Sequence, residues 1–396
     1  MISYYYYYLI EKMNCFLFQF ILFLSFLFLI KASKIITEEY SSKKNYIPNV
    51  LFELVEFNMD YKNWVNTFLP FSLFKDGNIE NKFPIVSTRK VKFYKEYTCN
   101  EYKTTIRLDE NNVVSNYSVI HASTFFIPDQ GWSFSYQVED ESFNLVYLLY
   151  KNKLIDNKIF AFHPKSSESK GKFYLGGLPK IDNLFTGVIN VDKSYPTWGT
   201  TIKEVRYNNE TYKLDKYAAF HTGFFNLLSS NYFFDLVILQ ILKSEYNSGK
   251  CNQTEVDKDY HEYGLICYKE IYDNLQPLEM VFNDITVTIK KENLFTKSDE
   301  NLYSSKFITN PYEHYNFTII GFEFIELFNY TAFNYEDSTI TFYTNQAIIT
   351  NNNNFVQFCQ LIKPISITIM LICLANIGIL FVFFLKNTGQ DRYLLI

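Results

Sequence analysis

The sequence lacks the features that mark nucleic-acid-binding and metal-binding proteins. It has 5 His and 13 Gly in 396 residues, no Cys-x-x-Cys pair and no sustained basic run, and its formal net charge is -5. We do not expect a nucleic-acid partner, because proteins recognise nucleic acids through clustered Lys and Arg. Without paired Cys and His ligands, we also expect no metal site and no cofactor.

Apolar and aromatic residues are abundant. The chain is 48% hydrophobic and 19% aromatic, with 33 Tyr and 40 Phe. Short runs of β-favouring residues are bounded by Asn, Asp, Gly, Lys or Pro, which is typical of strands. The clearest are Val91–Tyr94, Tyr117–Phe126, Phe173–Leu175, Gly187–Val191, Met280–Ile289 and Thr339–Tyr343. Two segments, Phe143–Lys153 and Tyr232–Leu242, have helical periodicity instead. We therefore predict an all-β body, and its length favours two lobes.

An apolar run lies near each end of the chain. Phe16–Ile30, followed by Ala32 and Ser33, is typical of a secretory signal peptide over residues 1–33. The alternative is an uncleaved membrane anchor, but about 15 residues are few for a bilayer. Pro364–Leu385 has no charged residue, and at ~1.5 Å per residue it can span a hydrocarbon core of ~30 Å. We expect a single-pass, type I membrane protein of the secretory or endolysosomal pathway or the cell surface.

The region between these runs contains features of a secreted protein. Five Asn-x-Ser/Thr sequons are expected to carry glycans on the luminal side: Asn116, Asn209, Asn252, Asn316 and Asn329. Cys251 and Cys267 close a short polar loop, and a disulfide is expected in an oxidising compartment. Zinc is the alternative for these two thiols, although no paired His accompanies them. Whether Cys99 pairs with Cys359 stays open.

Five motifs follow one another over Leu148–Thr344. They are a helix and strand (Leu148–Phe162), a segment with Gly176-Gly177, Thr186-Gly187 and Trp198, a Thr-Gly turn within Ala218–Leu228, the Cys251–Cys267 loop, and Ile319–Thr344. In this order they resemble the pepsin (A1) family of aspartic proteases, and residues 40–145 resemble it only faintly. The resemblance implies a bilobal, pepsin-like acid protease fold.

The resemblance also implies a division of the chain. We expect an N-terminal lobe over 34–190 and a C-terminal lobe over 191–348. An Asn-rich juxtamembrane linker (349–363), the transmembrane helix (364–385) and a cytoplasmic tail (386–396) are expected to follow.

The family's chemistry requires two Asp that share one proton, each in an Asp-Thr-Gly turn whose Thr braces the opposite loop. In the second lobe this turn is His221-Thr222-Gly223, with imidazole in place of the carboxylate. In the first lobe, two registers of Trp64–Phe74 fit: Asn66-Thr67 over Asp-Thr, or Leu69–Ser72 over the whole turn. Neither contains a carboxylate, and Asp76 is the nearest acid. We expect no intact catalytic residue; the alternative is that His221 is itself a base.

Three functions are compatible with these features. The first is a catalytically degenerate, pepsin-like membrane glycoprotein that binds polypeptide in the cleft between its lobes. The second is an active aspartic-type endopeptidase of the endolysosomal or vacuolar membrane, with its dyad rebuilt from other residues. The third is a structural surface glycoprotein. No feature of the sequence specifies an oligomeric state.

Overall fold

A computed structural model describes residues 34–41, 49–54, 59–67, 72–74, 86–92, 96–109, 111–121, 131–138, 140–164, 170–181, 183–257, 262–309 and 317–352. Several predicted features lie outside these residues: the signal-like run, Leu69–Phe71, Asp76, Asn316, Cys359, the apolar run Pro364–Leu385 and the tail. Within the described ranges, no helix is long and apolar enough to cross a membrane.

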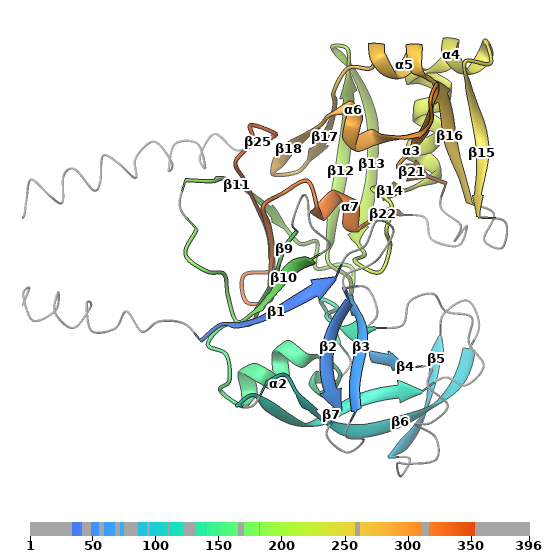
Figure 1. The fold of residues 1–396 in the computed structure, drawn as a ribbon. Coiled ribbons are helices and arrows are strands. Elements are labelled where there is room, and N and C mark those ends of the chain that lie inside the picture. Colours follow the sequence, from blue (N-terminus) through green and yellow to red (C-terminus); the bar gives the residue numbers. More distant parts are fainter. Residues whose placement is uncertain are drawn as a thin grey trace, which may run out of the picture.

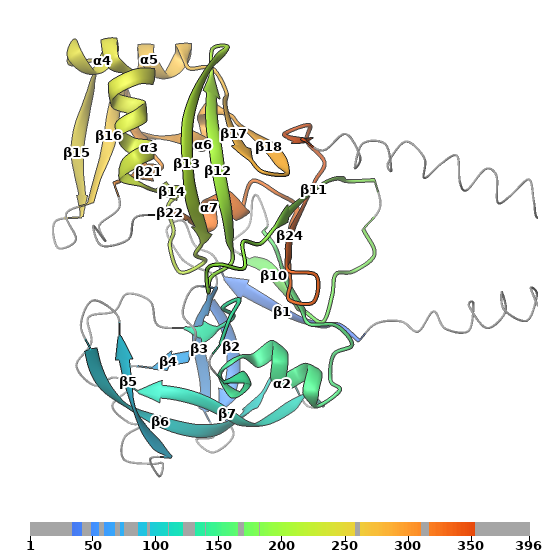
Figure 2. The same cartoon turned by 180° about the vertical axis from the view of Figure 1, so that it is seen from behind.

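The described residues form two lobes, which Figures 1 and 2 show on either side of a group of strands in the middle. The first lobe contains β2 (Asn49–Leu54), β3 (Met59–Asn66), β4 (Ser72–Phe74), β5 (Ser87–Lys92), β6 (Glu96–Arg107), β7 (Val113–His121) and β8 (Trp132–Ser133). Most of these strands pair in chain order, β2 with β3, β5 with β6 and β6 with β7. The predicted all-β, two-lobed body is confirmed.

The second lobe is built on an eight-stranded sheet with the order β21-β14-β22-β13-β12-β17-β18-β25. Its strands are β12 (Gly199–Tyr207), β13 (Glu210–Phe220), β14 (Leu228–Ser229), β17 (Leu278–Phe282), β18 (Ile285–Ile289), β21 (Phe307–Ile308), β22 (Thr318–Ile320) and β25 (Ile349–Asn351). The last of these falls within the segment that the sequence assigns to the juxtamembrane linker. It is an edge strand instead, because Ile285–Val287 pair with it.

Six strands join the lobes in the order β11-β24-β23-β9-β10-β1. They are β1 (Ile36–Ser41), β9 (Ile159–His163), β10 (Lys170–Leu175), β11 (Phe185–Asn190), β23 (Tyr330–Asn334) and β24 (Thr339–Thr344). Strands from both halves of the chain lie side by side here, since β9 and β11 of the first half pair with β23 and β24 of the second.

The helices are short, and the two that the sequence predicted begin at polar caps. Asn144 accepts a hydrogen bond from the N–H of Val146 and starts α2 (Leu145–Lys151). Ser230 accepts from the N–H of Phe233 and starts α3 (Asn231–Leu236), which continues as a π-helical turn, η3 (Val237–Ile241). These are the two segments with helical periodicity. The others are η2 (Glu141–Phe143), α4 (Lys243–Asn247), α5 (Lys269–Asn274), α6 (Lys291–Leu294) and α7 (Phe322–Ile325).

Aromatic side chains fill the core where the lobes meet the central strands. Trp198 is fully buried, and its ring lies 4.8 to 5.8 Å from those of Tyr136, Phe160, Phe333 and Tyr335. These residues come from both lobes and from two central strands. The abundance of Phe and Tyr in the sequence therefore reflects how this junction is packed.

The predicted disulfide is present in a separate four-stranded sheet, β15-β16-β20-β19. Its strands are β15 (Cys251–Asp257), β16 (Glu262–Tyr268), β19 (Phe295–Asp299) and β20 (Leu302–Ser305). Cys251 and Cys267 are directly opposite one another on β15 and β16, and both are fully buried. Because the two thiols are bonded to each other, the zinc alternative is wrong.

Removing this bond as Cys251→Ala/Cys267→Ala is expected to lower the free energy of unfolding by about 3 kcal/mol, because the unfolded chain loses a loop constraint. Urea unfolding of the full chain, with and without reductant, measures this. Reductant should not change the free energy of unfolding of the double variant, whereas it should lower that of the native chain to the value of the variant. A native chain whose stability is unchanged by reductant would contradict the expectation.

Candidate functional site

A loop in the second lobe carries the Thr-Gly turn. Strand β13 ends at Phe220 and runs parallel to β22, and the His221 N–H donates to the carbonyl of Ile320 at 2.8 Å. The chain then turns and returns as β14, on the other side of β22 and antiparallel to it. The His221–Gly223 turn is therefore held at the ends of paired strands.

The first lobe contains a corresponding arrangement. Strand β3 lies parallel to β8, with Val65 opposite Trp132 and Asn66 opposite Ser133. The next strand, β4, lies parallel to β7. In each lobe, one strand (β3 or β13) ends beside a short parallel strand (β8 or β22) that comes from much later in the chain.

Two threonines, Thr67 directly after β3 and Thr222 in the His221–Gly223 turn, are hydrogen-bonded to each other. The N–H of Thr67 donates to Oγ1 of Thr222 at 3.2 Å, and the N–H of Thr222 donates to Oγ1 of Thr67 at 3.1 Å. Oγ1 of Thr67 also donates to the carbonyl of Phe220 at 2.8 Å. Both threonines are fully buried, where unpaired polar groups would be costly. This reciprocal bonding favours the register with Asn66-Thr67 at the first-lobe turn over the one with Leu69–Ser72.

His221 lies next to this brace. Its side chain is 2% exposed, and its Nδ1 accepts a hydrogen bond from the N–H of Gly223 at 3.1 Å. A ring nitrogen that accepts carries no proton, so a neutral ring holds its proton on Nε2. The His221 imidazole is thus hydrogen-bonded to the backbone of its own turn through Nδ1.

The residues after this turn are large. Phe224 and Phe225 are both half-buried, and the Phe224 ring centroid lies 6.4 Å from that of His221. Their carbonyls accept hydrogen bonds from the N–H groups of Phe322 and Glu323. The loop is thus fixed through its backbone, and both rings retain surface that a ligand can contact.

One carboxylate is fixed to the same loop. Glu323, whose side chain is 11% exposed, pairs with Lys306 at 3.3 Å. Burial raises the pKa of the Glu323 carboxyl, and the Lys306 ammonium opposes this rise. The carbonyl of Lys306 also accepts a hydrogen bond from the N–H of Leu227. The Lys306 ammonium is therefore the ion-pair partner of this carboxylate.

The sequon asparagines and Cys99 are not part of the segments that carry Thr67 and Thr222. Asn116, Asn209 and Asn252 are exposed, and Asn329 is half-buried, with its Oδ1 accepting from the N–H of Asn345. Cys99 is a buried free thiol whose pKa is raised by burial. Among the described residues, no cluster of His, Cys, Asp or Glu is suited to hold a metal ion.

Sequence reasoning left the partner of His221-Thr222-Gly223 undecided between two registers. The residue that decides between them is Thr67, because its hydroxyl, one position after Asn66, is the hydrogen-bond partner of Thr222. The sequence shows the Thr67 hydroxyl, but it also shows one at Ser72, and no neighbouring residue distinguishes the two.

Comparisons with known proteins agree with this geometry. A family model described as eukaryotic aspartyl protease matches residues 130–345, more than half of the chain. The crystal structure of the aspartic proteinase from Irpex lacteus is similar in fold, with a TM-score of 0.58 and 14% sequence identity, over 79% of this chain and 98% of that chain. No curated protein matches the sequence.

Proposed function

Because the chain belongs to the eukaryotic aspartyl protease family, we propose that it is a catalytically degenerate, pepsin-like member. In this proposal it is a single-pass membrane glycoprotein that binds polypeptide between its lobes without cleaving it. The observation that supports the proposal is the reciprocal hydrogen bonding of Thr67 and Thr222. In this proposal, the residues directly before these threonines, Asn66 and His221, correspond to the two aspartates of the family.

The chemistry of these two side chains supports the loss of catalysis. The aspartyl protease reaction needs one carboxylate to draw a proton from water while a protonated partner polarises the scissile carbonyl. Asn66 contributes an amide, which does not titrate in this way. His221 directs Nδ1 to the Gly223 N–H, so its nearer nitrogen is occupied by the turn. Losing one member of such a pair removes most of the rate, because the two act as a unit.

Binding does not depend on the missing carboxylates. An extended peptide can add to a sheet through main-chain hydrogen bonds, while alternate side chains enter apolar pockets. The half-buried rings of Phe224 and Phe225, fixed on a loop beside the brace, provide apolar surface of the kind that such side chains contact.

The sequence supports the membrane part of the proposal. The apolar stretch Pro364–Leu385, the signal-like run Phe16–Ile30 and the sequons between them indicate one span and an external body.

We expect the purified chain to show no pepstatin-sensitive proteolysis of a denatured protein substrate between about pH 3 and 6, a range whose acidic half is where an Asp dyad shares a proton. His221→Asp should remain inactive, because Asn66 provides no second carboxylate. A native aspartic protease serves as the positive control. Cleavage by the native chain that pepstatin abolishes would contradict the proposal and favour a rebuilt dyad.

A further inference from the structure

The sequons differ in how far the fold buries the hydroxyl that completes them. An Asn-x-Ser/Thr sequence accepts a glycan only with a hydroxyl two residues after the Asn. The enzyme that attaches the glycan therefore has to contact that hydroxyl as well as the amide. Thr211, which completes the sequon of Asn209, is exposed, whereas Thr331, which completes that of Asn329, is fully buried.

Thr331 lies within the group of central strands. It is on β23, opposite Phe162 of β9 on one side and Phe342 of β24 on the other. Because β23 is paired along both edges, neither edge is open at this position. An enzyme that reads the Thr331 hydroxyl reaches it only when β23 is outside the sheet.

The Thr331 hydroxyl makes no visible contribution to the fold. Its Oγ1 is buried and has no hydrogen-bond partner among the described residues. A buried hydroxyl without a partner costs stability, because it gives up its hydrogen bonds to water and gains none. A valine would fill nearly the same space without this cost. The unpartnered hydroxyl therefore points to a use before the sheet forms.

The Asn329 side chain is compatible with a glycan in the folded chain. Its Oδ1 accepts a hydrogen bond from the N–H of Asn345 at 2.8 Å, which leaves Nδ2 for a glycan. This Nδ2 makes no hydrogen bond to the described residues, and it is not fully buried. The folded protein can therefore carry a glycan on Asn329, although it buries the hydroxyl that is needed to attach one.

A second sequon is closed in the same way. Asn116 is exposed, but Ser118, which completes its sequon, is fully buried. The Ser118 hydroxyl donates to Oε1 of Glu101 at 3.2 Å and lies 2.8 Å from the hydroxyl of Ser142. An enzyme that contacted this hydroxyl would have to break both hydrogen bonds.

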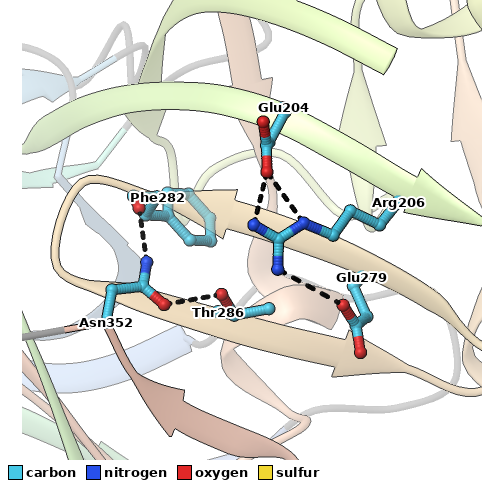
Figure 3. Close-up of polar contacts among 6 residues, drawn as sticks. All are labelled: Glu204, Arg206, Glu279, Phe282, Thr286 and Asn352. Carbon is cyan, nitrogen blue, oxygen red and sulfur yellow. Dashed lines mark hydrogen bonds and ion pairs between the residues drawn. The ribbon is translucent and has the colours of Figure 1, made fainter. Parts of the chain in front are cut away.

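The sequon of Asn209 stays open although it belongs to a well-paired hairpin. It lies at the turn between β12 and β13, which Figures 1 and 2 show at the outer end of the second lobe. Strand β12 also pairs with β17, and Arg206 forms ion pairs with Glu204 of its own strand and Glu279 of β17 (Figure 3). Asn209 and Thr211 are thus exposed because of their place at the tip of the hairpin.

We propose that Asn329 and Asn116 receive glycans only on the extended chain, before β23 and β7 pair with their neighbours, and that Asn209 accepts a glycan after folding as well. This inference rests on the glycosylation in the proposed function. In the transfer, Nδ2 bonds to the anomeric carbon of an oligosaccharide that is linked to a lipid pyrophosphate, and the amide loses one proton. The bond from that carbon to the pyrophosphate oxygen breaks, and the pyrophosphate leaves with the electron pair. A chain that folds before this step stays unmodified at Asn329.

Transfer to the folded chain tests the difference between the sites. Full-length chain is produced in cells whose oligosaccharyltransferase is inhibited, purified in detergent and checked for the Cys251–Cys267 bond. It is then incubated with purified oligosaccharyltransferase and a lipid-linked oligosaccharide, and mass spectrometry measures the occupancy of each sequon. Extended synthetic peptides with the same sequons are the positive control. We expect transfer to Asn209 and none above background to Asn329 or Asn116.

Variants of Thr331 test the use of its hydroxyl. Thr331→Val removes the hydroxyl and nearly keeps the shape, so glycosylation of Asn329 in uninhibited cells should be lost. The unglycosylated variant should unfold at the same or a higher urea concentration than the unglycosylated native chain, because no hydrogen bond is lost. Thr331→Ser retains the hydroxyl and should keep the glycan. A lower urea midpoint for Thr331→Val would overturn the inference, since the hydroxyl would then have a partner in the fold.

Three further results would overturn the inference. They are transfer to Asn329 of the folded chain as efficient as that to Asn209, no transfer to Asn209 of the folded chain, and chain from uninhibited cells with a glycan at Asn209 but none at Asn329. Occupancy in uninhibited cells also tests the premise. If no sequon carries a glycan there, the glycosylation in the proposed function fails and the inference with it. If glycans are present but one of the three results is found, only the inference fails.

Discussion

Replacing Gly321 with alanine is expected to destabilise the second lobe by more than about 4 kcal/mol, which is exceptional for a single substitution. Gly321 directly follows β22 and packs against the backbone of the loop that carries His221. A Cβ at this position would lie 2.7 Å from the carbonyl oxygen of Phe224 and closer still to that of Asn226. Both obstructing atoms belong to the backbone, so the loop itself would have to move. Such a cost approaches the whole stability of many domains, about 5–15 kcal/mol.

Protease resistance and urea unfolding of the full chain measure this effect. Gly249→Ala is the control, because Gly249 has a positive φ of +74°, but a Cβ added to it would meet no atom within 4 Å. Left-handed backbone costs alanine about 1–2 kcal/mol, so the difference between the two variants isolates the close approach. If Gly321→Ala unfolds as late as Gly249→Ala, the loop is not packed against β22 as described.

Trp198→Ala is the second substitution with a large expected effect. Removing a fully buried aromatic side chain costs about 3–5 kcal/mol, because the surrounding rings close the cavity only in part. Trp198 also donates from Nε1 to the carbonyl of Phe134 at 2.8 Å. Phe134 directly follows β8, the strand beside Asn66. The variant is therefore expected to loosen the first-lobe turn as well as the core.

Trp198→Phe separates these two contributions. It keeps most of the packing against Phe160 and Tyr335 but leaves the Phe134 carbonyl without its donor, for which about 1–3 kcal/mol is expected. Urea unfolding midpoints of the three proteins give the comparison. Equal loss in Trp198→Ala and Trp198→Phe would mean that the aromatic packing contributes nothing, contrary to the burial of this ring.

Much of this molecule follows from the sequence by itself. Short runs of apolar and β-favouring residues predicted the strands, and the order of the motifs from Leu148 to Thr344 predicted the family and the fold. The Cys251–Cys267 bond was predictable because both residues lie in one hairpin, where chain connectivity brings them together. His221-Thr222-Gly223 was identified because its Thr and Gly are adjacent in the chain. Each of these features is formed by residues close together in the chain, where sequence spacing determines how far apart they lie in space.

The tertiary structure decided what depends on long-range pairing. The chain separates Thr67 from Thr222 by 155 residues, and only the strand pairs β3–β8 and β13–β22 show that they meet. Pairing with β18 likewise places Ile349–Asn351 in the sheet, although their Asn-rich surroundings indicated a linker. The small apolar cluster of Ala161, Tyr174 and Ala332 also forms only when β9, β10 and β23 lie side by side. Contacts between segments that are distant in the chain do not produce a repeating pattern in the sequence of either segment, and therefore no local pattern predicts them.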